Sequence, residues 1–164
     1  MKPIIKLKNI KVLESLSEET HCFTAVLYVD GKKFADVSNH GHGGNDDVHP
    51  FNKDYQKVVD LENKIKRTYP KIESEFLEGG MDNSLEIICC NMINDWLIMR
   101  DFKKLMKRVC YVKPNEIDIY QLPSKFKPSP ETIQAIKAKA SWAKKVIFLA
   151  DISEDEAFQI FKNN

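Results

Sequence analysis

Apolar and polar residues alternate along the first forty positions of the chain. Residues 4–14 and 21–29 show the alternation that is typical of a half-buried β-strand. Asp30 and Gly31 separate the second run from residues 32–39, and this dipeptide favours a type I′ hairpin turn because both central positions need positive φ. The pattern therefore predicts an N-terminal antiparallel meander of three strands.

Helical spacing of apolar residues predicts two helices in the middle of the chain. In residues 51–69 the apolar side chains recur at intervals of three and four, and Pro70 ends the run. A second, longer helix is predicted from about residue 83 to about residue 108. Its first half is apolar nearly all round, which is typical of a helix buried in the centre of a protein. We therefore expect the three-stranded meander to pack on this long central helix.

The last part of the chain predicts further short strands and two C-terminal helices. Two short β-rich runs precede a loop at 123–130 that contains three prolines. Pro130 suits the first turn of one helix, and Ser153 with Glu156 matches a capping box for the last helix. The order of the elements predicts an α+β fold in a single globular domain over residues 1–164.

Composition is that of an ordinary globular protein. Hydrophobic residues make up 43% and charged residues 30% of the 164 residues, which excludes a disordered chain. No apolar run approaches the roughly 18 residues of a membrane span, so we expect no membrane partner. The chain has four cysteines and no CxxC pair, and Cys89 and Cys90 are adjacent in an apolar segment. Buried thiols in a reducing compartment are therefore expected, together with a cytoplasmic location.

The segment "VSNHGHGGNDDVHP", residues 37–50, holds three of the four histidines and is the first candidate site. Imidazole and carboxylate groups bind divalent metals, and the candidate ligands are His40, His42, Asp46, Asp47 and His49. Glycine-rich backbone can instead bind an anion through its N–H groups, here at Gly41, Gly43, Gly44 and Asn45. In a third interpretation these residues only permit positive φ in a connection with solvated histidines. In each case we expect residues 39–49 to form an exposed, glycine-hinged connection between the third strand and the first helix.

A basic segment is the second candidate site. Residues 100–145 contain 12 Lys/Arg and 4 Asp/Glu, whereas the rest of the chain contains 13 Lys/Arg and 20 Asp/Glu. The candidate contacts to nucleic acid or to an acidic protein are Arg100, Lys103, Lys104, Lys107, Arg108, Lys125 and Lys127. Phe126, beside Lys125 and Lys127, would add a stacking residue to this charged surface. The alternative is a solvated helix end, where cations complement the helix dipole.

The run "LSEETHCFTAVLYVDGKKFADVSNHGHGG", residues 16–44, and the later "SEDEAFQIF" resemble small hypothetical proteins of bacteriophages and mobile elements. Those proteins have a "GK…N-x-G-x-GG" segment after a hairpin. The resemblance covers about a quarter of the chain and implies an accessory protein that acts on host machinery or nucleic acid. It implies no catalytic residue.

These observations favour a non-enzymatic binding or regulatory module that acts on a host protein or on nucleic acid. The alternative is a metal-dependent enzyme, similar to a phosphoesterase or nuclease, that uses the histidine-containing loop 39–49. The sequence contains no P-loop, GxSxG, HExxH or EF-hand motif and no second ligand cluster, which makes the binding module the stronger hypothesis.

Overall fold

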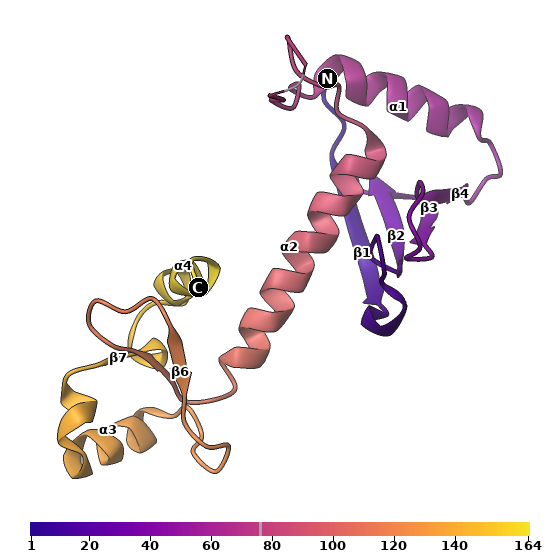
Figure 1. Cartoon of the computed structure of the whole chain (residues 1–164). Helices are drawn as coiled ribbons and strands as arrows, with labels where there is room; N and C mark the ends of the chain where they lie inside the picture. Colours follow the sequence, from indigo (N-terminus) through magenta and orange to yellow (C-terminus); the bar gives the residue numbers. More distant parts are fainter. Residues whose placement is uncertain (76) are drawn as a thin grey trace. The chain divides into compact units, whose positions relative to one another are not determined.

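A computed structural model describes residues 1–75 and 77–164, and it has the predicted α+β class. The chain divides into two compact units, Met1–Asn94 and Asp95–Asn164. The helix α2 (Leu85–Leu105) begins in the N-terminal unit and ends in the C-terminal unit (Figure 1). The single domain expected from the sequence stays a prediction, and each unit is described here by itself.

The N-terminal unit contains a four-stranded antiparallel sheet with the strands in sequence order (Figure 1). The strands are β1 (Ile5–Val12), β2 (Phe23–Val29), β3 (Lys32–Asn39) and β4 (Asp47–Pro50). The predicted hairpin turn between β2 and β3 is confirmed, since Asp30 has φ 50° and Gly31 has φ 81°.

The fourth strand corrects the predicted three-stranded meander. Val48 pairs with Val37, and Asp47 pairs with Ser38, so the end of the histidine-containing segment extends the sheet. The strand alternates between exposed and covered side chains, but a run of only four residues that ends in proline is too short to be recognised in a sequence. Its pairing with β3 places it in the sheet.

One face of this sheet is buried. Leu27 on β2 and Ala35 and Val37 on β3 are at most 1% exposed. The helix α1 (Gln56–Thr68) follows the sheet and buries Leu61 and Ile65. These side chains form part of the core of the N-terminal unit.

The helix α1 begins five residues later than the pattern predicts. Lys53 has φ 57°, and the side-chain oxygen of Asn52 accepts a hydrogen bond from the backbone N–H of Asp54. This local turn holds the backbone outside the helical region. At the other end Tyr69 is extended (ψ 148°) before Pro70, which confirms the predicted stop.

The first half of α2 is fixed to the N-terminal unit. Leu85, Cys89 and Ile93 are at most 1% exposed. The carboxylate of Glu62 on α1 accepts a hydrogen bond from the N–H of Leu85, at 3.2 and 3.3 Å from its two oxygens. Cys90 is exposed, which corrects the expected burial of both adjacent thiols, because helical geometry rotates neighbouring side chains by about 100°.

The C-terminal unit contains a three-stranded antiparallel sheet in the order β6-β5-β7. The strands are β5 (Cys110–Val112), β6 (Ile119–Gln121) and β7 (Ile147–Phe148). The helices are α3 (Pro130–Lys139) and α4 (Glu154–Lys162), and short 3-10 turns lie at Ser141–Lys144 and Leu149–Asp151. A further 3-10 turn, Glu14–Leu16, belongs to the N-terminal unit. The predicted short strands and two C-terminal helices are thus confirmed.

Local signals define the helix ends of this unit. Ser129 caps α3 by accepting a hydrogen bond from the N–H of Thr132, directly before Pro130. Ser153 and Glu156 form the predicted capping box of α4.

Two small apolar clusters form the interior of the C-terminal unit. Phe102 is 1% exposed and contacts the rings of Phe158 and Phe161 at centroid distances of 5.1 and 5.6 Å. The other cluster contains Ile133 and Phe148. Within the described residues, no helix has the length and apolar character needed to cross a bilayer.

Candidate functional site

The histidine-containing segment is held by the buried side chain of Asn39, which is 6% exposed. Its oxygen accepts hydrogen bonds from the hydroxyl of Thr20 at 2.7 Å and from the N–H of Gly41 at 2.9 Å. Its amide nitrogen donates to the carbonyl of Gly44 at 3.2 Å and to the carboxylate of Asp46 at 3.1 Å. Four hydrogen bonds to one buried amide fix the conformation of residues 39–46.

The backbone of Gly41 is also fixed. Its carbonyl accepts hydrogen bonds from the N–H groups of Glu18, Glu19 and Thr20. Its φ is 89°, and a Cβ atom at this position would lie 2.1 Å from the carbonyl oxygen of Leu16. The expected glycine hinge is therefore corrected at Gly41, which is packed against residues 16–20, a contact that a sequence pattern does not reveal. Most of the other residues of the segment 39–49 are exposed, as predicted.

The three histidines of the segment have separate partners. The Nε2 atom of His40 lies 3.5 Å from the carboxylate of Asp47, and the Nδ1 atom of His42 lies 3.1 Å from the carboxylate of Glu18. His49 lies on β4, where its Nδ1 atom is 3.3 Å from the hydroxyl of Tyr55. In the part of the chain that the structure describes, no three His, Cys, Asp or Glu side chains are grouped in a way that could hold a metal. Metal binding by this segment stays a prediction.

Asp46 occupies the most unusual electrostatic position of the segment. Burial raises the pKa of its carboxyl group above the ordinary value, against the lowering effect of the hydrogen bond from Asn39, and Glu86 raises it further. One carboxyl oxygen of Asp46 is buried without a hydrogen-bond partner among the described residues. Asp47 and Glu86 also act on Asp46 as like charges, and a bound anion would add further repulsion of the same sign, so the carboxylates of this segment disfavour an anion here. Anion binding by Gly41, Gly43, Gly44 and Asn45 stays a prediction.

The basic segment belongs to the C-terminal unit, which carries 13 Lys/Arg and 9 Asp/Glu. Several of its cations are neutralised: Arg100 pairs with Asp101 at 2.8 Å, and Lys137 pairs with Asp151 at 2.6 Å. No ion pair with another described residue is formed by Lys103, Lys104, Lys107, Arg108, Lys125, Lys127 or Lys139.

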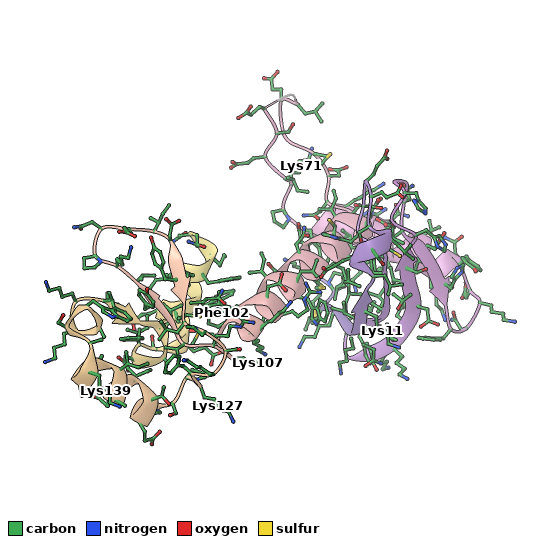
Figure 2. The ribbon with its side chains drawn as sticks, turned by 60° about the horizontal axis from the view of Figure 1, so that its bottom comes forward. Lys11, Lys71, Phe102, Lys107, Lys127 and Lys139 are labelled. Atoms are coloured by element: carbon green, nitrogen blue, oxygen red, sulfur yellow. The ribbon has the colours of Figure 1, made fainter. Side chains whose placement is uncertain are left out.

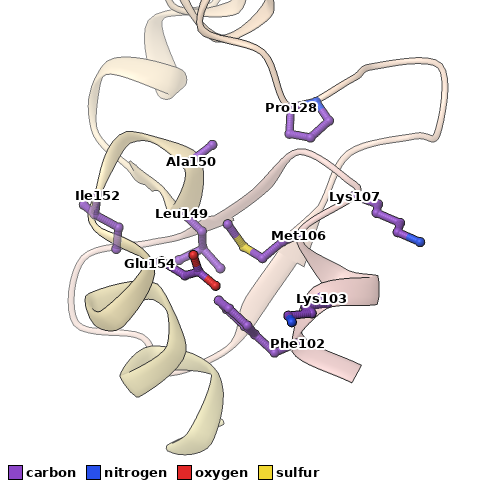
Figure 3. Close-up of a pocket in the computed structure, with 9 residues that line it drawn as sticks. All are labelled: Phe102, Lys103, Met106, Lys107, Pro128, Leu149, Ala150, Ile152 and Glu154. Carbon is purple, nitrogen blue, oxygen red and sulfur yellow. The ribbon is translucent and has the colours of Figure 1, made fainter. Parts of the chain in front are cut away.

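Two hollows flank the end of α2. Trp96, Met99 and Arg100 line one of them together with Lys103, Lys104 and Lys107. The second, of about 400 Å³, lies beside Phe102, Met106 and Pro128 and shares Lys103 and Lys107 with the first (Figure 3). Glu154 also lines this second hollow, and Lys107 extends away from it (Figure 3).

A third hollow of about 440 Å³, which we call the aromatic hollow, lies on the other side of the loop 123–129. Its lining includes Leu122, Phe126, Ile136, Lys139, Ala140 and Trp142. Trp142 is 40% exposed, and the centroid of its ring lies 5.1 Å from that of Tyr111. The amino group of Lys125 lies 5.3 Å above the ring of Phe126. The aromatic hollow therefore combines an exposed indole with lysines.

The loop 123–129 connects these features into one surface of the C-terminal unit. Pro128 lines the hollow that contains Lys103 and Lys107, whereas Phe126 lines the aromatic hollow with Lys139. Figure 2 shows Lys107, Lys127 and Lys139 along one side of this unit. We call Lys103, Lys107, Lys127 and Lys139 the lysine path.

Sequence reasoning found three members of the lysine path and the stacking candidate Phe126. It counted Lys139 only toward the basic bias and did not include Trp142 in the site. Lys103 and Lys107 are close in sequence, so their spacing indicated a common face. Phe126 and Trp142 are brought together only by the packing of the loop on α3. The available signal was the presence of aromatic residues within a lysine-rich stretch.

Comparison with protein-family models, with curated proteins and with solved structures found no significant match to this chain.

Proposed function

We propose that the C-terminal unit binds nucleic acid, with the lysine path contacting successive phosphates. The observation that carries the proposal is a set of lysines that form no ion pair with another described residue, beside hollows that are lined by aromatic rings. A lysine that forms no ion pair with a described carboxylate can bind the phosphate of an external ligand and displace the cations condensed on it.

The aromatic rings favour nucleic acid over an acidic protein. Trp96 lies in the hollow with Lys103 and Lys107, and Trp142 lies in the hollow with Lys139. Proteins that bind single-stranded nucleic acid combine a positive groove with rings on which bases stack. A carboxylate-rich partner would use the lysines but would gain little from the rings.

The position of Glu154 limits the route of the phosphates. Its side chain lies in the hollow beside Phe102, whereas Lys107 extends away from that hollow (Figure 3). We infer that the phosphates follow Lys107 and the loop 123–129 and do not enter the hollow itself.

The test is the binding of a fluorescein-labelled oligothymidylate, followed by fluorescence anisotropy at several salt concentrations. Each phosphate contact to a single strand contributes about −0.7 to the slope of log affinity against log salt. Four contacts, one for each lysine of the lysine path, therefore predict about a 50-fold loss of affinity between roughly 50 and 200 mM salt. The variant Lys103→Glu/Lys107→Glu should bind more weakly and with a shallower slope.

The matched control is Lys6→Glu/Lys11→Glu, which changes the net charge equally at two exposed positions of β1 in the N-terminal unit. This variant should retain most of the affinity if the lysine path is the site. If both variants lost the same affinity, the net charge of the protein would explain the binding, and the lysine path would not be a specific site. No binding of the unmodified protein at low salt would reject nucleic acid as the ligand.

The predicted bacteriophage or mobile-element origin, and the metal-dependent enzyme as the alternative function, stay predictions. The binding function proposed here requires neither of them.

A further inference from the structure

We propose that the aromatic hollow stacks an unpaired nucleobase, so that the C-terminal unit prefers single-stranded nucleic acid to a duplex. This inference rests on the proposed function, because the lysine path must hold the adjoining phosphates. It adds a base-contacting site to a phosphate-contacting surface.

The size and lining of the aromatic hollow suit a flat, largely apolar group. Its volume of about 440 Å³ lies within the roughly 300–1,000 Å³ that is typical of small-ligand sites. Leu122, Ile136 and Ala140 supply apolar surface, while Phe126 and Trp142 supply rings. A base in a duplex is covered on both faces by its neighbours and cannot enter such a hollow.

The indole of Trp142 is available to a ligand although it also contacts the protein. Its ring is tilted by 43° against Tyr111 and by 42° against Phe148, at centroid distances of 5.1 and 6.4 Å. These contacts hold the ring in place, and 40% of the residue stays accessible to solvent. A ring that is already fixed loses little conformational entropy when a base stacks on it.

Charge around the aromatic hollow matches a phosphate on either side of a stacked base. Lys139 lines the hollow, and Lys125 lies over the ring of Phe126. Lys127 follows in the same loop and is exposed. No described carboxylate lines this hollow, in contrast to the one that contains Glu154. Charge complementarity thus favours a nucleotide over an uncharged apolar ligand.

The experiment compares an oligothymidylate with an abasic oligomer of the same length, so that the number of phosphates is equal. Base–aromatic stacking contributes about 1–3 kcal/mol per base, which corresponds to about 5- to 150-fold in affinity. The oligothymidylate should bind more tightly than the abasic strand by a factor in this range. A hairpin duplex, whose bases are already stacked, should leave the emission of Trp142 unchanged, as the abasic strand does.

Fluorescence gives a second readout that does not require the hollow to be mutated. The variant Trp96→Phe leaves Trp142 as the single tryptophan, since the chain contains two. Its emission should be quenched by the oligothymidylate and should be unchanged by the abasic strand at equal saturation. The variant Trp142→Leu should lose the preference for bases and keep its affinity for the abasic strand.

The outcomes separate this inference from the proposed function. Equal affinity for both strands, with unchanged Trp142 emission, would overturn base stacking and leave phosphate binding in place. If none of the three probes bound at low salt, both proposals would be overturned. If polyglutamate displaced the labelled oligothymidylate as effectively as unlabelled oligothymidylate does, the surface would be assigned to an acidic protein.

Discussion

Replacing Asn39 by alanine should destabilise the N-terminal unit more than any change to an exposed polar residue of the same sheet. The side chain is 6% exposed and makes four hydrogen bonds, two as acceptor and two as donor. At about 0.5–1.5 kcal/mol each, these bonds contribute about 2–6 kcal/mol. Because Gly44 is exposed and water can replace one bond, we expect a loss of about 2–4 kcal/mol in the free energy of unfolding.

The assay is urea denaturation followed by far-UV circular dichroism, combined with hydrogen exchange of β2 and β3. Trp96 and Trp142 both belong to the C-terminal unit, so tryptophan fluorescence would not report on the N-terminal sheet. With a urea m-value of about 1–3 kcal/mol/M, a loss of about 3 kcal/mol lowers the midpoint by about 1–3 M. Exchange of the β3 amides should accelerate in parallel.

The matched control is Ser38→Ala, on the same strand. Ser38 is partly exposed and has no side-chain hydrogen bond to another described residue. Its replacement should change stability by less than about 0.5 kcal/mol. If Asn39→Ala and Ser38→Ala were equally stable, the four hydrogen bonds would contribute nothing net, and the reasoning would be refuted.

Three further predictions concern the same unit. Gly41→Ala should lower the free energy of unfolding by about 2–4 kcal/mol, and Gly44→Ala should lower it by only about 1–2 kcal/mol. Both residues have positive φ, but only at Gly41 would the added Cβ atom lie 2.1 Å from a carbonyl oxygen. Equal losses in urea denaturation would contradict this reasoning. Burial raises the pKa of Asp46, so its contribution to stability is present below the unfolded pKa and is lost as pH rises through the folded pKa. Asp46→Asn should therefore be more stable than the unmodified protein at neutral pH in urea denaturation, and this gain should vanish in acid. Alkylation followed by mass mapping should modify exposed Cys90 rapidly and buried Cys89 slowly, since burial raises the pKa of the Cys89 thiol to about 12; equal rates would refute the assignment.

Elements with local signals could be predicted from the sequence. The turn at Asp30 and Gly31, the stop before Pro70 and the capping box at Ser153 and Glu156 each depend on residues within four positions of one another. Backbone sterics and short-range hydrogen bonds determine such features before any tertiary contact forms. The long central helix was predicted for the same reason, within about three residues at each end.

Features that depend on distant contacts required the tertiary structure. The strand β4 exists because Val48 pairs with Val37, and the buried position of Asn39 exists because Thr20 and Gly44 supply its partners. Neither strand alternation nor composition encodes these pairings. The histidine-containing segment was therefore recognised as unusual, while the packing of Gly41 against residues 16–20 was not.

The candidate site divides in the same way between sequence and structure. An excess of lysine in residues 100–145 is a property of composition, and it indicated a charged surface directly. Which of these charges form ion pairs with distant residues was decided by folding, since Asp151 pairs with Lys137 from 14 positions along the chain. The aromatic hollow was likewise decided by folding, because Phe126 and Trp142 meet only when the loop 123–129 packs on α3. An excess of one charge can be counted in a sequence, whereas a cavity forms only when several elements of the structure pack together.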